Sequence, residues 1–430
     1  MSDETMSEYK VSILPQKGYY KNQIAVNMLE YFDREGYNFE GKVVLLKPSF
    51  VMPSSDPKIT LATDTNNSLI AGVAKALWLR GAKRIIIAEH RTIGPARYAF
   101  YAVEIKSAVK DVKNVEFCYL DEVKMVKTEL EDPLIPDYEV KYPKLLLDDT
   151  VDYFISLPKL KMNIYTQVTL SIKNNFGLIS KKERLKYHSD KDLDEHLASL
   201  SLIRQPDLII TDAIIAGEGQ GPHLTTPVNT GMIVCGTNPL AVDTVCCNLI
   251  GVDPHSIGHL KILQERGLGP LELDQIQIEN EEYFNSKKKA FSIPDEALEM
   301  TPLMNAYLGD KACVAGCVGM LRGSLDSYAS EKGWYSMGKL NIILGDVEIP
   351  EEELKKLDKK RTIVYGDCAK KYKKYGIYFK GCPPDYVKSL LKMSFLGPLG
   401  LNPNLKLSRV SPYKYAKAWG FHILQRIFRF

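Results

Sequence analysis

The chain has 430 residues, of which 45% are hydrophobic and 25% are charged, and its formal net charge at pH 7 is +3. This length can supply two or three domains with sizeable cores, and the composition excludes a disordered or fibrous protein. The small net charge predicts no particular partner, and nucleic acid is not expected because the basic residues show no paired aromatic stripe outside the C-terminal tail.

The chain begins with the acidic, polar stretch Met-Ser-Asp-Glu-Thr-Met-Ser-Glu. This stretch lacks the apolar region of a signal peptide, and no uninterrupted apolar segment approaches the roughly 18 residues that a membrane-spanning helix needs. We therefore expect a cytoplasmic protein. The eight cysteines suggest no disulfide framework, which fits a reducing compartment.

Strands and helices alternate along the first two thirds of the chain. Residues 43–47 and 84–90 predict buried strands, and the apolar periodicity of 67–80 predicts a helix between them. Similar apolar runs predict further elements, with strands at 151–157, 207–210 and 232–234 and a helix at 239–250. This alternation indicates an α/β fold with a doubly wound, mostly parallel sheet.

Three lysines follow predicted strands. Lys159 and Lys161 are two residues apart in an extended segment, so their side chains should face one side, and Lys173 comes next to Asn174 and Asn175. Ligands of open α/β sheets collect beyond the carboxyl ends of the strands, so these residues predict an anion-binding cleft. The alternative is that the lysines lie on solvated loops.

A glycine-rich segment, residues 217–222, follows Asp212 and is predicted to be a loop whose backbone can approach a ligand closely. Glu218 in this segment is a candidate acid if the loop closes over the cleft and raises the carboxyl pKa. His188 and His223 are further candidate proton donors, although the polar surroundings of His188 favour a solvated loop.

The last third of the chain holds four cysteines, Cys313, Cys317, Cys368 and Cys382, beside glycines or predicted helix starts. A helix is expected after Cys317 and another after Cys382, and helix N-termini stabilise thiolates. Cys368 follows the β-branched strand 361–366. That strand, the strand 340–344 and a helix starting near Pro350 predict a βαβ unit that carries the cysteines.

The spacing C-x3-C, then C-x13-C about 50 residues later, matches neither a zinc ribbon nor the ferredoxin run. Three interpretations remain open: four small buried side chains, a closed zinc site, or a 4Fe–4S cluster. We favour the cluster. The contexts of the other cysteines predict core positions for Cys118, Cys235, Cys246 and Cys247.

The chain after Asp385 has no acidic residue and eight basic ones. Residues 412–430 predict a basic amphipathic helix, which either docks on the protein core or a second subunit, or lies on an anionic membrane surface. We predict three parts: a substrate-binding domain over 1–300, a cluster-binding unit over 301–395, and a tail over 396–430.

Several ordered motifs resemble the domain of unknown function 362 family. They are Lys47-Pro48, 81–89, 157–161, 171–177, Asp212 with 217–222, and 239–243, and the resemblance spans about 40–265. Members often carry 4Fe–4S ferredoxin modules, so the resemblance implies iron–sulfur chemistry. This chain departs from the family in lacking the ferredoxin run, and in having Asn163 and Thr63-Asp-Thr-Asn66 where the family commonly has histidine-containing motifs.

These observations predict an iron–sulfur oxidoreductase or electron-transfer protein. One 4Fe–4S cluster on the four cysteines would reduce an anionic or lipid-linked substrate held by Lys159, Lys161 and Lys173, with a redox partner such as ferredoxin. The alternative is a zinc-stapled, non-catalytic protein that binds an anionic ligand. A homodimer, and a peripheral position on the inner face of the membrane through 412–430, are further hypotheses.

Overall fold

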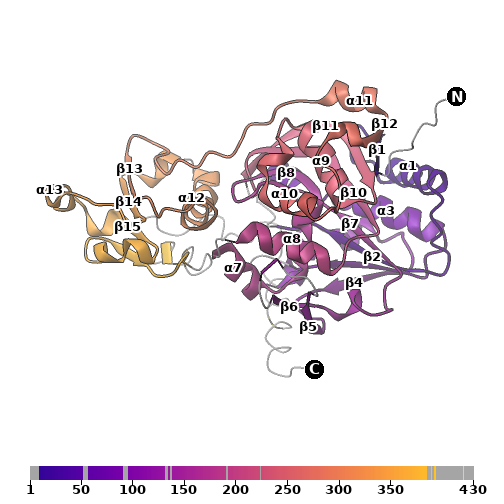
Figure 1. Cartoon of the computed structure of the whole chain (residues 1–430), viewed down its shortest axis with the longest axis horizontal. Coiled ribbons are helices and arrows are strands. Elements are labelled where there is room, and N and C mark those ends of the chain that lie inside the picture. The colour runs from indigo at the N-terminus through magenta and orange to yellow at the C-terminus, as the bar shows by residue number, and fades with distance from the viewer. Residues whose placement is uncertain are drawn as a thin grey trace.

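The computed structural model describes residues 9–51, 57–90, 95–130, 134–135, 138–189, 192–222, 224–332 and 334–384, together with 389, 392, 393 and 420. It confirms the α/β class: a large mixed, mostly parallel sheet is followed by a small parallel sheet of four strands (Figure 1). His223 and, apart from residue 420, the predicted tail over 412–430 lie outside the described residues. The roles suggested for them stay predictions.

The large sheet has the strand order β12-β1-β11-β10-β7-β2-β3-β4, with β8 beside β10 and β9 beside β8. The strands β10, β7, β2, β3 and β4 run parallel, whereas β11 is antiparallel to both β1 and β10. The strands are Tyr9–Pro15 (β1), Val43–Pro48 (β2), Arg84–Glu89 (β3), Val115–Tyr119 (β4), Tyr153–Leu157 (β7), Lys159–Asn163 (β8), Gln167–Thr169 (β9), Leu208–Gln220 (β10), Leu224–Gly236 (β11) and Ile276–Glu279 (β12). Met125–Glu129 (β5) and Glu139–Pro143 (β6) form a separate antiparallel pair.

Helices cover the large sheet on both faces. They are Lys21–Arg34 (α1), Pro57–Thr63 (α2), Asn67–Leu79 (α3), Ala96–Ala102 (α4), Ile105–Ala108 (α5), Ser171–Asn174 (α6), Lys181–Ser189 (α7), Leu193–Ile203 (α8), Pro239–Leu249 (α9), Gly258–Glu265 (α10) and Glu281–Lys287 (α11). The starts of α3 and α9 follow from their capping residues, since the side chains of Asn66 and Asn238 accept backbone hydrogen bonds from Ser68 and Ala241.

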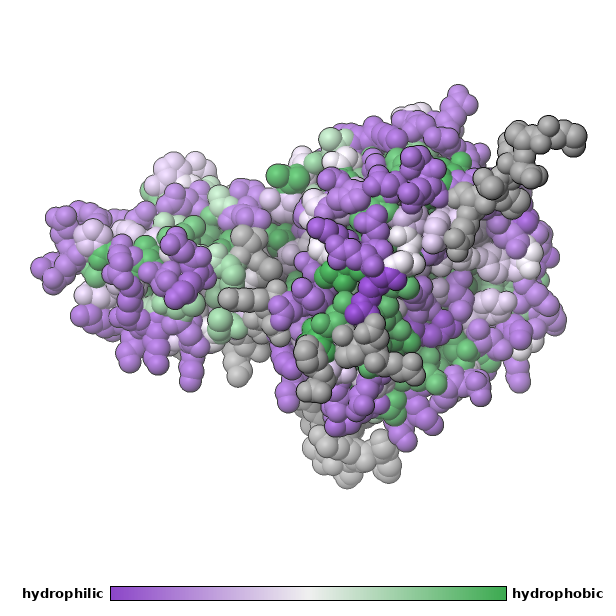
Figure 2. Space-filling model, in the orientation of Figure 1, coloured by the Kyte–Doolittle hydropathy of each residue, from purple (hydrophilic) through white to green (hydrophobic). Residues whose placement is uncertain are grey.

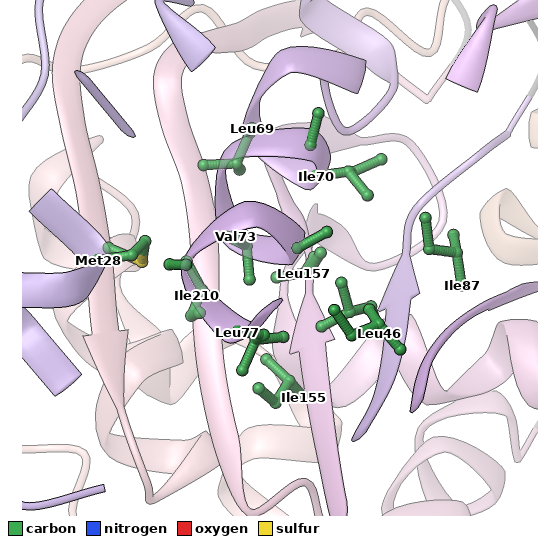
Figure 3. Close-up of a cluster of buried hydrophobic side chains, with 14 of the residues drawn as sticks. Met28, Leu46, Leu69, Ile70, Val73, Leu77, Ile87, Ile155, Leu157 and Ile210 are labelled. Carbon is green, nitrogen blue, oxygen red and sulfur yellow. The ribbon is translucent and has the colours of Figure 1, made fainter. Parts of the chain in front are cut away.

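The core lies between α3 and the parallel strands. Leu69, Val73 and Leu77 follow a helical period and pack against buried side chains of β2, β7 and β10 (Figure 3). The opposite face of β2, β3 and β7 is also buried, against a second cluster that includes Leu45 and Phe154. Burial on both faces explains why β2 and β3 are almost uninterrupted apolar runs. Among the described residues, no helix combines the length and the apolar character needed to cross a membrane.

The small sheet contains the predicted strand–helix–strand unit and extends it on both sides. Its parallel strands, in spatial order, are Met304–Leu308 (β13), Leu340–Leu344 (β14), Thr362–Tyr365 (β15) and Ile377–Phe379 (β16). The helix Gly319–Lys332 (α12) lies between β13 and β14 in the chain and packs on one face. The helix predicted near Pro350 is only one turn, Glu351–Leu354 (α13), because the lysine-rich residues after Leu354 offer little apolar surface to bury.

The glycine-rich segment 217–222 is not the predicted loop. Residues up to Gln220 continue β10 and pair with β11 in a long hairpin. The glycines allow protein backbone, rather than a ligand, to come close: a Cβ atom at Gly217 would lie 2.5 Å from the Ala62 carbonyl oxygen, and one at Gly221 would overlap the Met162 carbonyl.

The hairpin also binds the segment that leads to the small sheet. The Gly219 amide donates to the Ser292 carbonyl at 2.8 Å. The Gln220 side chain donates to the Asp295 carbonyl at 3.0 Å and accepts from the Asp295 amide at 2.9 Å. The connection between the two sheets is therefore hydrogen-bonded along the hairpin.

Candidate functional site

Four lysines gather at the carboxyl edge of the large sheet. Lys47 lies near the end of β2, Lys159 and Lys161 lie on β8, which continues the line of β7, and Lys173 lies on α6. All four side chains are buried, and Lys173, the most exposed, is 8% exposed. Their charges act on one another, since Lys47 and Lys159 help to lower the pKa of Lys161, and Lys161 helps to lower that of Lys173. The structure thus brings the three predicted lysines together with a fourth, inside the protein rather than on solvated loops.

Two of these lysines are paired with carboxylates. The Lys47 Nζ lies 2.7 Å from Glu89 Oε2, and the Lys159 Nζ lies 3.1 Å from Asp212 Oδ2. The Tyr19 hydroxyl joins the second pair, because it donates to Asp212 at 2.8 Å and accepts from Lys159 at 2.8 Å. Burial lowers the pKa of both lysines and raises that of Glu89, while each partner's charge opposes the shift. The two pairs are therefore electrically balanced.

Lys161 and Lys173 form no ion pair within the described residues. The Lys161 ammonium donates to the Thr63 carbonyl, and the Lys173 ammonium donates to Asn163 Oδ1 at 2.8 Å and to the Thr166 hydroxyl. Burial lowers the pKa of Lys161 to about 8 and that of Lys173 to about 7. The charge of Asp64 raises the pKa of Lys161 and that of Asp194 raises the pKa of Lys173, so each ammonium group is partly compensated from a distance. Two buried ammonium groups whose hydrogen-bond partners are all neutral are nevertheless suited to hold an anion, which would add to this compensation.

The buried polar atoms near these lysines that have no hydrogen-bond partner in the described part of the chain include two from neighbouring segments. They are the Thr63 hydroxyl, on the residue whose carbonyl holds Lys161, and Asn175 Oδ1. The residue before Asn175, Asn174, bonds Lys47 at 3.0 Å. Since buried polar atoms are normally paired, these two are available to a ligand.

Asp243 fixes the short helix that carries Lys173. Its carboxylate accepts hydrogen bonds from the amides of Ser171 at 2.8 Å and Ile172 at 3.0 Å, at the start of α6. Burial raises the pKa of Asp243 to about 7. This contact between α9 and α6 positions the Lys173 ammonium.

The low pKa of Lys173 predicts a dependence of stability on pH. Between pH 7 and about 10 the unfolded chain keeps a proton on Lys173 that the folded chain has lost, so the free energy of unfolding should rise with pH. Urea unfolding from pH 7 to 9.5 should give a slope for the wild type that exceeds that of Lys173→Met by about 1.4 kcal/mol per pH unit. Parallel curves for the two proteins would contradict the shift.

The other three C-terminal cysteines interact electrostatically with Cys317, which lies beside Gly366, the residue that follows β15. A Cβ atom at Gly366 would lie 2.9 Å from Cys317 Sγ, and the residue has φ of +88°. The Asp367 amide donates to the Gly381 carbonyl at 2.9 Å, which brings the neighbourhoods of Cys368 and Cys382 together.

The electrostatic interactions among the thiols affect the ionisation of Cys317. Burial raises the pKa of the Cys317 thiol, and the charges that Cys313, Cys382 and Cys368 would carry raise it further. A hydrogen bond with Cys313 contributes to the same rise. A cation bound among the thiols would reverse this penalty on ionisation.

Four thiolates are the donor set of both a structural zinc ion and a 4Fe–4S cluster. In the described residues, no group of three or more His, Cys, Asp or Glu side chains already has the spacing of a metal site. None of the eight cysteines forms a disulfide. As predicted, Cys235, Cys246 and Cys247 are buried in the core, and Cys118 is partly buried on β4.

Tyr165 lies between the lysines and the cysteines. Its hydroxyl is 3.7 Å from the Met320 sulfur, and its ring centroid is 5.7 Å from the Lys173 Nζ. Met320 follows the turn Val314–Val318, which contains Cys317, and this turn contacts α7. In Figure 1, α7 and α12 face each other where the two parts of the protein meet. The two candidate sites are therefore neighbours across this junction.

His188 does not lie on the predicted solvated loop. It lies on α7, where its ring packs 4.9 Å from the Tyr165 ring and 5.2 Å from the Phe176 ring. The polar sequence around it misled the prediction because the apolar surface that covers His188 comes from other segments. Glu218 lies on β10, and its carboxylate accepts a hydrogen bond from the Ser292 amide at 3.2 Å, which ties it to the connecting segment.

Glu89, Tyr19 and Tyr165 were not predicted from the sequence to be parts of the site. Glu89 could have been noticed, because it is a charged residue at the end of an otherwise apolar buried strand. The sequence around Tyr19 and Tyr165 shows no comparable pattern that would indicate a place in the site.

Residues 44–248 match the model of a family described as domain of unknown function (DUF362), so the chain contains a DUF362 domain. The domain includes all four buried lysines, and the four C-terminal cysteines lie beyond it. Thylakoid-associated protein sll1697 of Synechocystis sp. is 32% identical over 124 residues, which are 28% of this chain and 39% of that protein, so the match covers well under half of the relative. A protein from Thermotoga maritima of known crystal structure matches with a TM-score of 0.35 and 12% identity, over 54% of this chain and 59% of that one.

Proposed function

We propose that this protein is an iron–sulfur oxidoreductase or electron-transfer protein in which Cys313, Cys317, Cys368 and Cys382 hold one 4Fe–4S cluster. The observation that supports the proposal is that Cys317, beside Gly366, interacts with three thiols, Cys313, Cys368 and Cys382, so that the four come from three separate segments. When bound, such a cluster supplies or accepts single electrons. A cytoplasmic location, with membrane contact through 412–430, belongs to the same proposal.

The neighbouring lysine site favours a cluster over zinc. A closed structural zinc site would act only by stabilising the small sheet, and this role does not require buried ammonium groups nearby. Here the turn that carries Cys317 contacts α7, and Tyr165 reaches from Met320 to Lys173. This arrangement suits a redox centre beside the place where its substrate binds.

In this proposal Lys161 and Lys173 hold an anionic group of the substrate, whether free or lipid-linked. Lys173, with its pKa of about 7, can also give up a proton near neutral pH, which is the property of a general acid. The paired lysines, Lys47 and Lys159, add polar groups to the site without adding net charge.

Metal analysis of the full chain purified without oxygen tests the proposal. We expect iron and acid-labile sulfide in equal amounts, a broad absorption shoulder in the blue, and an electron paramagnetic resonance signal after reduction. Colourless protein without iron would overturn the proposal. Stoichiometric zinc in the same sample would favour the second candidate, a zinc-stapled protein that binds an anion without catalysis.

A further inference from the structure

Five lysines lie between the last two of the four C-terminal cysteines, and no acidic residue separates them. We call Lys370, Lys371, Lys373, Lys374 and Lys380 the lysine rim. All five are exposed. Cys313 and Cys382 are exposed as well, whereas Cys317 is buried. The cysteine site therefore reaches the surface beside a concentration of positive charge.

The lysine rim surrounds the residues that shape the cysteine site. The Asp367 carboxylate accepts hydrogen bonds from the Tyr378 hydroxyl and from the Gly381 amide at 3.1 Å. Asp367 directly precedes Cys368, and Gly381 directly precedes Cys382. Lys370 is two residues after Cys368 and Lys380 is two residues before Cys382, so exposed positive charge lies beside both cysteines.

The charge of the lysine rim is largely uncompensated. Within the described residues only Lys371 of the five forms an ion pair, with Glu348. The lysines near the opposite end of β15 differ: Lys355 and Lys356 pair with Glu351 and Glu353 on or beside α13. Figure 2 shows hydrophilic side chains over much of the surface of this part of the protein.

We infer that the lysine rim is the docking surface for a small acidic one-electron carrier protein of the ferredoxin class. The inference rests on the proposed function, because it makes the exposed edge of the cysteine site the place where electrons enter. One electron would pass from the reduced carrier, which would be oxidised, to the cluster that the four cysteines would hold, which would be reduced, and no bond would be formed or broken. Complementary charge steers such encounters and sets their dependence on salt.

A nucleic acid or an anionic membrane would also attract lysines. Neither explains why the lysines are gathered beside exposed thiols, where a redox partner must come close because electron transfer falls steeply with distance. A compact acidic protein can cover both the rim and the exposed cysteines.

Binding of a plant-type 2Fe–2S ferredoxin, followed by fluorescence anisotropy at low and at moderate salt, tests the inference on the anaerobically purified full chain. The variant Lys370→Glu/Lys374→Glu/Lys380→Glu should bind the ferredoxin at least about tenfold more weakly than the wild type and lose most of the salt dependence. The control Lys355→Glu/Lys359→Glu/Lys360→Glu makes the same change in net charge at positions that precede β15 in the chain. It should bind the ferredoxin as tightly as the wild type does.

The iron content of each protein separates the possible failures. If the rim variant has normal iron content and unchanged affinity for ferredoxin, the docking surface is overturned and the proposed function stays intact. An equal loss of ferredoxin affinity in both triple variants would have the same meaning. Absence of binding by an iron-loaded wild type would do the same. A wild type without iron would overturn the proposed function and this inference with it. Tighter binding of a DNA duplex or of anionic vesicles through the same lysines would reject the protein carrier in favour of that ligand.

Discussion

Replacing Cys317 by serine should remove most of the iron from the protein together with the broad visible absorption. Cys317 is the buried member of the four cysteines, and its Sγ lies against the position where a Gly366 side chain would be. A hydroxyl group is a poor ligand for iron in such a site, and burial leaves no room for water to take its place. Iron and sulfide analysis and the absorption spectrum check this outcome.

Cys118→Ser is the matched control for this experiment. Cys118 is a partly buried cysteine on β4, in the other sheet, and burial raises its pKa in the same direction. The control protein should keep the iron content of the wild type. Wild-type iron in Cys317→Ser, or an equal loss in both variants, would show that Cys317 is not a ligand.

Replacing Glu89 by glutamine should lower the free energy of unfolding by about 3–5 kcal/mol, which is typical for removing one partner of a buried ion pair. The substitution keeps the size of the side chain but removes the charge that balances Lys47. The Lys47 ammonium would then keep only neutral partners, the Pro48 carbonyl at 2.9 Å and the Asn174 side chain at 3.0 Å. Urea unfolding of the wild type and the variant at pH 7 measures the loss.

Two further variants test whether burial is the cause of the expected loss of stability in Glu89→Gln. Glu116→Gln removes the carboxylate from an exposed pair with Arg84 on neighbouring strands and should lose only about 0.2–1 kcal/mol. The double variant Lys47→Met/Glu89→Leu replaces the buried pair by apolar groups and should recover much of the stability lost in Glu89→Gln. A loss below about 1 kcal/mol in Glu89→Gln would contradict a charged pair and indicate that Lys47 and Glu89 share one proton.

Local sequence patterns predict the parallel core well. The apolar runs that became β2 and β3 and the period of α3 lie almost where they were expected, because each element buries its own side chains in a regular pattern. The long β10–β11 hairpin was missed beyond Asp212, because its outer part depends on pairing between two glycine- and proline-containing segments.

The candidate sites depend on contacts that no local pattern contains. The proximity of the cysteines was expected from their places near strand ends and helix starts, and Cys313, Cys368 and Cys382 each interact electrostatically with Cys317. For Lys159 the location was predicted but the environment was not, since its partners Asp212 and Tyr19 lie far away in the chain. Tyr165 could not be predicted for the same reason, because its neighbours Met320 and Lys173 lie on helices beside different sheets.

The hydrogen bonds between the β10–β11 hairpin and residues 292 and 295 affect how much of the time the cysteine site and the lysine site are close to each other. A free linker would let the small sheet swing, and the local concentration of the cysteine site around the lysine site would fall as the volume explored by the linker grows. A linker fastened to the hairpin keeps that concentration high and constant. The cysteine site and the lysine site would then be in the same relative position whenever an electron arrives. The rate of the reaction would depend on the chemistry and on partner docking, and not on a movement of the small sheet toward the large sheet.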